Sequence, residues 1–206
     1  MTELVIARYQ ENLDWVQKIS SVDCVTVYNK HYEFNNLPNL GREAETYLYH
    51  IIHRYDSLSE YTIFSQGDPL FHEHEFIEKI NDLNNLIQST KKTGIRFFSF
   101  EDTEPVTGVK RQEHPNGLPI YYFLDLLFGI ELQSTIDVKY NCAALFIVHK
   151  NNILSRPKEF YQFLRCFVSN SKNPMEAWIF ERLWKYIFNP KIPTNNKYLR
   201  FLNDLH

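Results

Sequence analysis

Short apolar runs alternate along the chain with longer stretches in which apolar residues recur every three or four positions. The runs are typical of buried strands and the recurrences of amphipathic helices. They predict strands at residues 4–7, 22–28, 61–64, 95–100 and 143–148. They predict helices at residues 13–19, 42–58, 74–87, 121–128, 153–167 (interrupted near 156–157) and 174–187. Strands that alternate with helices predict an α/β fold.

The organisation of the chain favours one domain. The 206 residues contain no internal repeat and no long linker, although residues 101–118 hold many helix- and strand-breaking residues and are expected to form a surface loop. We therefore expect residues 1–206 to form a single domain with a Rossmann-like mixed sheet flanked by helices.

Composition excludes several classes of protein. A formal net charge of -3 argues against general nucleic-acid binding, and the 6 glycines form neither a phosphate-binding loop nor a dinucleotide fingerprint. No apolar run reaches the roughly 18–20 residues of a membrane span, and the first residues do not resemble a signal peptide. The cysteines, at positions 24, 142 and 166, fit neither a disulfide framework nor a zinc site. These features predict a soluble, cytoplasmic protein.

Polar side chains follow three of the predicted strands. In open α/β sheets, ligands bind outside the carboxyl ends of the strands. The loops at residues 8–12, 28–30 and 65–68, with the start of the helix at 39–42, therefore predict a ligand site. Tyr9 is suited to stack on a base and Asn29 to bond its edge, while Arg42 offers a fork to phosphate oxygens. The candidate ligand-binding residues are Arg8, Tyr9, Asn29, Lys30, Arg42, Gln66 and Asp68.

The segment from Asp68 to Glu75 is the densest cluster of possible metal ligands. It contains His72 and His74, which would share a face only on an extended segment. No third histidine stands at a recognisable zinc-binding distance along the chain. Asp68 and His72 are retained as metal-ligand candidates, and a solvated loop is the alternative interpretation.

The last predicted helix carries two glutamates beside tryptophans. Glu181 lies three residues after Trp178 and three before Trp184, so it borders the aromatic stripe. A carboxylate half-buried among aromatic rings has a raised pKa, which suits a general base. Glu181 is the first candidate and Glu176 the second. The alternative is a glutamate on the helix surface that pairs with a neighbouring Arg or Lys.

A set of motifs resembles an uncharacterised family, the domain of unknown function number 3431. The set begins with the segment from Leu4 to Trp15 and continues with Tyr28-Asn-Lys30 and residues 37–44. Near the far end it includes Arg156-Pro157, Asn173-Pro174 and Glu181-Arg-Leu-Trp184. The resemblance spans most of the chain, leaving out residues 88–135 and the tail. The family name implies no activity.

The order of the parts also resembles the GT-A type of nucleotide-sugar glycosyltransferase. Tyr9-Gln-Glu-Asn12 is similar to the loop after the first strand of these enzymes, and Asn39-Leu-Gly-Arg42 to their loop before a helix. Their Asp-x-Asp metal motif is replaced by Ser65-Gln-Gly-Asp68. The resemblance implies a GT-A-like fold and a nucleoside diphosphate sugar as donor. A Mn²⁺ or Mg²⁺ ion held by Asp68, or alternatively Arg8, Arg42 or Lys30, would neutralise the diphosphate.

The resemblance implies transfer of a sugar to a hydroxyl acceptor, such as a glycan or glycoprotein, with Glu181 or Glu176 as the base. Two other functions stay open. The missing Asp-x-Asp favours a non-catalytic nucleotide- or carbohydrate-binding module with a decayed transferase fold. A metal-dependent hydrolase would use Asp68, His72 and His74.

Overall fold

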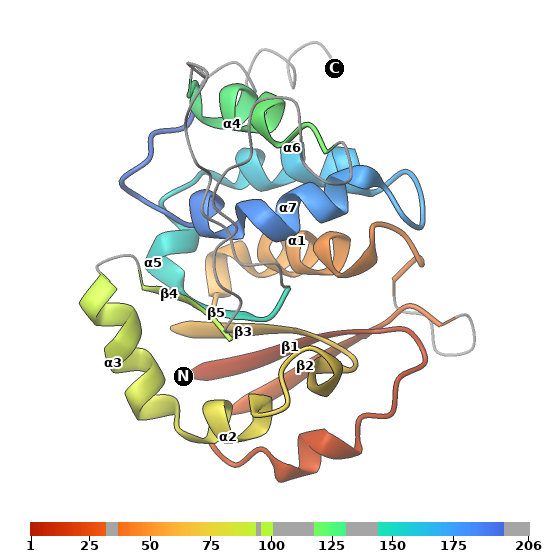
Figure 1. The fold of residues 1–206 in the computed structure, drawn as a ribbon, viewed down its shortest axis with the longest axis vertical. Helices are drawn as coiled ribbons and strands as arrows, with labels where there is room; N and C mark the ends of the chain where they lie inside the picture. Colours follow the sequence, from red (N-terminus) through yellow and green to blue (C-terminus); the bar gives the residue numbers. More distant parts are fainter. Residues whose placement is uncertain (32–36, 94–95, 101–117, 131–143, 196–206) are drawn as a thin grey trace.

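Five strands form one mixed sheet in the computed structural model of the chain, which describes residues 1–31, 37–93, 96–100, 118–130 and 144–195 (Figure 1). The strands are β1 (Thr2–Arg8), β2 (Cys24–Asn29), β3 (Tyr61–Gln66), β4 (Phe97–Ser99) and β5 (Phe146–His149). Their order is β2-β1-β3-β5-β4. β1 pairs in parallel with β2 and β3, whereas β5 is antiparallel to β3 and β4. The carboxyl ends of β1, β2 and β3 therefore meet at one edge.

Helices cover both faces of this sheet (Figure 1). The α-helices are α1 (Arg42–Arg54), α2 (Phe76–Asn81), α3 (Leu83–Thr93), α4 (Ile120–Phe128), α5 (Lys150–Ile153), α6 (Lys158–Val168) and α7 (Met175–Ile187). The short 3-10 turns are η1 (Asp14–Lys18), η3 (Tyr55–Ser57) and η4 (Pro69–Phe71). Buried residues of α1, α4, α6 and α7 form the core on one face, and those of η1, α2 and α3 form the core on the other.

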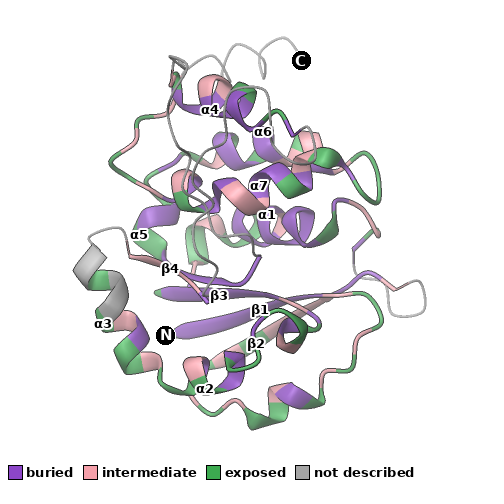
Figure 2. Cartoon of the chain, in the orientation of Figure 1, coloured by how far each residue is buried: buried purple, intermediate pink, exposed green. Residues whose placement is uncertain are grey.

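β1 lies between β2 and β3 and is buried on both sides (Figure 2). Side chains alternate across a strand, so Val5 and Ala7 join the core with α1. Leu4 and Ile6 join the core with α2. A strand buried on both faces is apolar throughout, which explains the continuous apolar run in the sequence.

Aromatic rings fill the larger core. Tyr47 of α1 lies with its ring centroid 4.8 Å from that of Phe64 and 6.2 Å from that of Trp184. Trp184 in turn stacks on Phe188 at 5.7 Å. All four side chains are at most 1% exposed, so these aromatic residues pack the space between α1, α7 and the sheet. This packing fixes α7 against α1, whose first turn lies at the carboxyl edge of the sheet.

The predicted class, a mixed α/β sheet flanked by helices, is confirmed, and the largest differences lie in the helices. The predicted helix at 74–87 is two helices, α2 and α3, which part at Asp82. Asn81 bonds the backbone of Lys18 and Ser20, which ties the end of α2 to the η1 segment. The predicted helix at 13–19 is only a 3-10 turn. The predicted loop at 101–118 lies outside the described residues except for its last residue.

Candidate functional site

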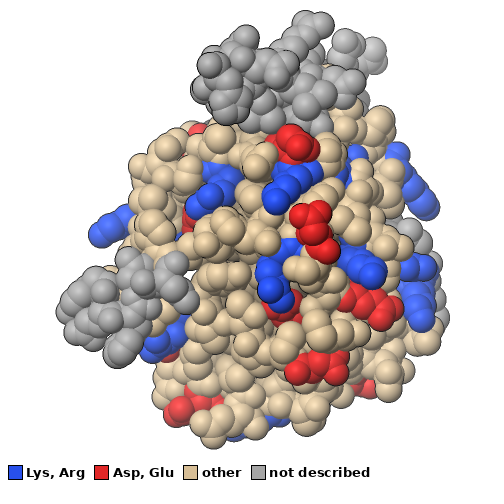
Figure 3. Space-filling model, turned by 180° about the vertical axis from the view of Figure 1, so that it is seen from behind, with Lys and Arg blue, Asp and Glu red and all other residues tan. Residues whose placement is uncertain are grey.

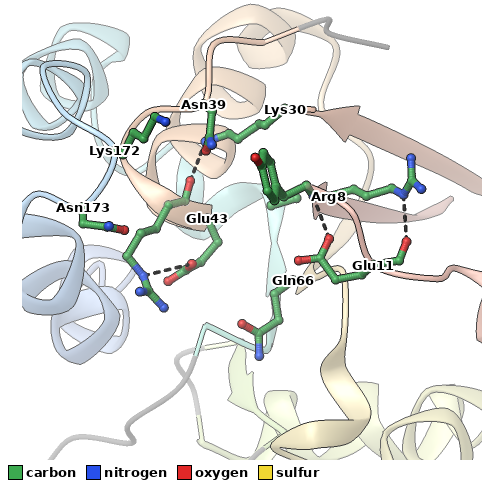
Figure 4. A pocket seen from close by; sticks show the side chains of 11 residues that line it. Arg8, Glu11, Lys30, Asn39, Glu43, Gln66, Lys172 and Asn173 are labelled. Atoms are coloured by element: carbon green, nitrogen blue, oxygen red, sulfur yellow. Dashed lines mark hydrogen bonds and ion pairs between the residues drawn. The ribbon is translucent and has the colours of Figure 1, made fainter. Parts of the chain in front are cut away.

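A cleft of about 300 Å³ opens at the carboxyl edge of β1, β2 and β3 (Figure 4). Its volume is at the lower end of the range for small-molecule sites. The lining residues come from the ends of the three strands, the start of α1 and the α6–α7 loop: Ala7, Arg8, Tyr9, Glu11, Lys30, Asn39, Arg42, Glu43, Gln66, Lys172 and Asn173. Arg8 and Glu11 stand on one side, and Lys172 and Asn173 on the other (Figure 4).

The structure brings five of the predicted ligand-binding residues together in this cleft: Arg8, Tyr9, Lys30, Arg42 and Gln66. Tyr9 is 40% exposed, and its ring meets that of His31 edge to face. Asn29 does not line the cleft. It is buried at the end of β2, where its Oδ1 accepts a hydrogen bond from the backbone N–H of His31.

The loop after β1 is held in shape by the carboxylate of Glu11. Its Oε2 accepts hydrogen bonds from the backbone N–H groups of Tyr9, at 2.6 Å, and Gln10, at 3.1 Å. Arg8 Nε donates to the Glu11 carbonyl at 2.9 Å. This carboxylate packs against Gly67, where an added Cβ would lie 2.5 Å from Glu11 Oε2. Gly67 therefore leaves the space that the folded loop requires.

The opposite wall is the start of α1. Gly41 and Arg42 both have left-handed backbone angles, with φ of 62° and 52°. An added Cβ at Gly41 would lie 2.3 Å from the Val168 carbonyl oxygen, and the Gly41 N–H donates to the Ser171 carbonyl at 2.8 Å. The first turn of α1 is thereby joined to the α6–α7 loop, which carries Lys172 into the cleft.

Lys30 connects the two walls. Its side chain is 5% exposed, and its Nζ donates to the carbonyl oxygens of Leu40 and Arg42, both at 2.5 Å. Nζ also lies 3.4 Å from Glu45, whose carboxylate accepts two hydrogen bonds from Arg165 at 2.7 and 3.0 Å. Burial lowers the pKa of Lys30, and the neighbouring Glu45 carboxylate opposes that change. The buried charge is thus compensated inside the protein.

Glu181 of α7 does not line the cleft, but it is close enough to the lining residues Arg42 and Glu43 for their charges to act on it. Burial, followed by the Glu43 carboxylate, raises the pKa of Glu181 from 4.5 to about 7, although Arg182 and Arg42 act in the opposite direction. Arg42 also packs over the ring of Trp178 at 5.3 Å and lies 3.6 Å from Glu43. A carboxyl group that titrates near neutral pH beside a cationic cleft has the properties of a general base.

The other predicted residues lie elsewhere. Glu176 is in the first turn of α7 and is partly exposed. Asp68 and His72 are exposed on either side of the η4 turn and do not line the cleft. Within the described ranges, no group of three His, Cys, Asp or Glu side chains is arranged to hold a metal ion.

Reasoning from the sequence missed six of the eleven lining residues: Ala7, Glu11, Asn39, Glu43, Lys172 and Asn173. Glu11 and Asn39 lie inside loops that were already predicted to form the ligand site, so their positions could have identified them as lining residues. Lys172 and Asn173 had none, because they belong to a loop more than 100 residues after the strands in the sequence. Only the packing of α6 on α1 brings that loop to the cleft.

The excess of cationic side chains among the described residues is confined to the cleft and does not extend over the surface around it. Four of its lining residues, Arg8, Lys30, Arg42 and Lys172, are cationic, and two are acidic. On the face shown in Figure 3, basic and acidic side chains of the described residues are interspersed, without an extended patch of one sign. Among the described residues, no helix is long and apolar enough to cross a membrane.

Comparison with known proteins shows the family of the chain. A family model described as "Protein of unknown function (DUF3431)" matches residues 4–104 and 104–198, and the chain belongs to this family. No curated protein and no solved structure gives a significant match. The comparisons therefore add no support to the resemblance to GT-A glycosyltransferases, which stays a hypothesis.

Proposed function

We propose that the protein transfers a sugar from a nucleoside diphosphate sugar to a hydroxyl group of an acceptor such as a glycan. One observation carries the proposal. A cleft with four cationic and two acidic lining residues lies at the carboxyl edge of the parallel strands, and burial raises the pKa of Glu181, near Arg42 and Glu43, to about 7. The cations suit a diphosphate leaving group, and the carboxylate suits removal of a proton from the acceptor.

Different cleft residues suit different parts of the donor. Tyr9 is exposed at the end of β1, where its ring would stack on the nucleoside base. Arg42 and Lys172 would bind the diphosphate oxygens, Arg42 with two parallel N–H groups. Gln66, at the end of β3, would donate or accept a hydrogen bond at the sugar or ribose. A cleft of about 300 Å³ accommodates the diphosphate and an adjacent ring, with the rest of the ligand on the open side.

In the proposed reaction, the Glu181 carboxylate accepts the proton of the acceptor hydroxyl. The acceptor oxygen forms a bond to the anomeric carbon of the sugar, and the bond from that carbon to the diphosphate oxygen breaks. The nucleoside diphosphate leaves with the electron pair of the broken bond. Arg42 and Lys172 stabilise the negative charge that develops on it.

Calorimetry with UDP-glucose, GDP-mannose and the free nucleoside diphosphates tests the binding step, each with and without Mn²⁺. We expect at least one donor to bind, and Arg42→Gln and Lys172→Gln each to weaken binding about 10-fold, the loss of one charge-assisted contact. Lys185→Gln is the matched control, because Lys185 is exposed on α7 and does not line the cleft. Absence of binding by every donor would refute the proposal.

Turnover separates the transferase from the non-catalytic binding module. Release of nucleoside diphosphate is followed by chromatography with a panel of saccharide acceptors. We expect Glu181→Gln to retain donor affinity and to lose about 100-fold or more in turnover, within the range of general-base catalysis. A wild-type protein that binds donors without releasing product would favour the binding module instead.

A further inference from the structure

Lys30 occupies an unusual position in the cleft. It is the first residue after β2, and its backbone N–H donates to the Arg8 carbonyl at 2.8 Å, at the end of β1. Its side chain runs from there toward the start of α1 (Figure 4). Lys30 therefore connects the end of β1, the end of β2 and the first turn of α1, which all contribute residues to the cleft.

The turn that Lys30 reaches is strained. Arg42 has a φ of 52°, in a region that L-residues with a side chain rarely adopt and that is populated mostly by glycine. Such a backbone persists only where its surroundings hold it. Two hydrogen bonds of 2.5 Å from Lys30 Nζ, to the carbonyls of Leu40 and Arg42, enclose Gly41 and hold the turn on both sides.

The ammonium group of Lys30 is directed at the protein. Two of its three N–H groups donate to the carbonyls of Leu40 and Arg42. Nζ also lies 3.4 Å from Glu45 Oε2. Arg165 holds Glu45 in place through two hydrogen bonds to Oε1. A ligand phosphate would have to displace these buried contacts to reach Nζ. Arg42, by contrast, has a side chain that is 38% exposed.

We propose that Lys30 is a positioning residue, which holds the turn at residues 40–42 so that Arg42 meets the diphosphate, and that it makes no contact with the diphosphate itself. That the ligand is a diphosphate rests on the proposed function, whereas the role of Lys30 in the turn is independent of it. The two parts are therefore tested by separate measurements.

The first measurement is a double-mutant cycle on ligand affinity. UDP and inorganic pyrophosphate are titrated into the wild type, Lys30→Met, Arg42→Gln and the double variant. If Lys30 acts through Arg42, each single variant loses about 10-fold in affinity and the double variant loses no more than Arg42→Gln alone. Losses that multiply in the double variant would show that Lys30 contacts the diphosphate directly and would overturn the inference.

The conservative variant Lys30→Arg provides a second check on the same readout. A guanidinium can donate to two carbonyl oxygens and pair with Glu45, so it should recover most of the affinity that Lys30→Met loses. Lys30→Met leaves Glu45 with one cation fewer in a buried site. The variant Lys30→Met/Glu45→Gln removes both charges and replaces Lys30→Met in the cycle if that protein does not fold.

The second measurement needs no ligand. Hydrogen exchange is followed by mass spectrometry in the wild type, Lys30→Met and Lys30→Arg. We expect the segment at residues 38–46, which contains the Glu45 N–H bond to the Gly41 carbonyl, to exchange about 10-fold faster in Lys30→Met alone. Unchanged exchange there would overturn the inference even if diphosphates bind. Faster exchange without binding by the wild type would instead refute the proposed function and leave the role of Lys30 in the turn standing.

Discussion

Replacing Glu181 with glutamine should stabilise the protein above neutral pH. Burial of Glu181, together with the Glu43 carboxylate, raises its pKa from 4.5 to about 7, against the opposing effect of Arg182 and Arg42. Between these two pH values the folded protein holds a proton that the unfolded chain releases. The stability from this group is therefore complete below about pH 4.5 and is lost as the pH rises through 7.

The magnitude follows from the size of the pKa change. A rise from 4.5 to about 7 corresponds to roughly 3 kcal/mol of free energy of unfolding, at about 1.4 kcal/mol per unit. The Glu181 side chain is 21% exposed, and partial access of water reduces the effect. We expect ionised Glu181 to cost the wild type about 1–3 kcal/mol at pH 8. Glu181→Gln, which carries no charge, avoids this cost.

Urea unfolding at pH 5 and pH 8 measures the effect. The free energy of unfolding of Glu181→Gln, relative to the wild type, should be higher at pH 8 than at pH 5 by about 1–3 kcal/mol. Glu176→Gln is the matched control, since it removes a carboxylate from the first turn of the same helix. An equal difference at both pH values would refute the raised pKa and with it the argument for Glu181 as a base at neutral pH.

Three further predictions concern other buried features. Burial lowers the pKa of His50 to about 4, so stability should fall as the pH decreases from about 6.5 to 4, and His50→Gln should flatten this dependence in urea unfolding. If the free energy of unfolding of His50→Gln fell as steeply with decreasing pH as that of the wild type, the prediction would be wrong. Gly67→Ala would displace the Glu11 carboxylate, 2.5 Å from the new Cβ, and calorimetry should show donor affinity reduced about 5-fold, the value of one hydrogen bond. Unchanged affinity would show that the loop tolerates the methyl group. Gly41→Ala should lower the free energy of unfolding by about 2–3 kcal/mol, against about 1 kcal/mol for Gly129→Ala, because both glycines have positive φ but only the first is crowded. Equal losses would contradict this ranking.

Much of the fold could be predicted from local pattern. The apolar run at residues 4–7 is inside β1, and the three-and-four recurrence from Ala44 to Ile52 is the buried face of α1. These patterns are readable because burial on a strand or helix repeats at a fixed period. The pattern failed at Asp82, where the recurrence continues through a break between α2 and α3. Asn81 forms hydrogen bonds to the distant η1 segment at that break, and the spacing of apolar residues cannot indicate such contacts.

The same division holds for the candidate site. The sequence by itself determined that polar loops follow the first three strands, and parallel pairing of those strands was enough to bring Arg8, Tyr9 and Gln66 to one edge. Only the tertiary structure decided that Lys172 joins them and that Lys30 turns its charge toward Glu45. The rules of sheet topology favour pairing between strands that are near one another in the sequence, as β1 pairs with β2 and β3. The direction of a charge depends on which distant groups are buried with it, and that is settled when α1, α6 and the sheet pack together.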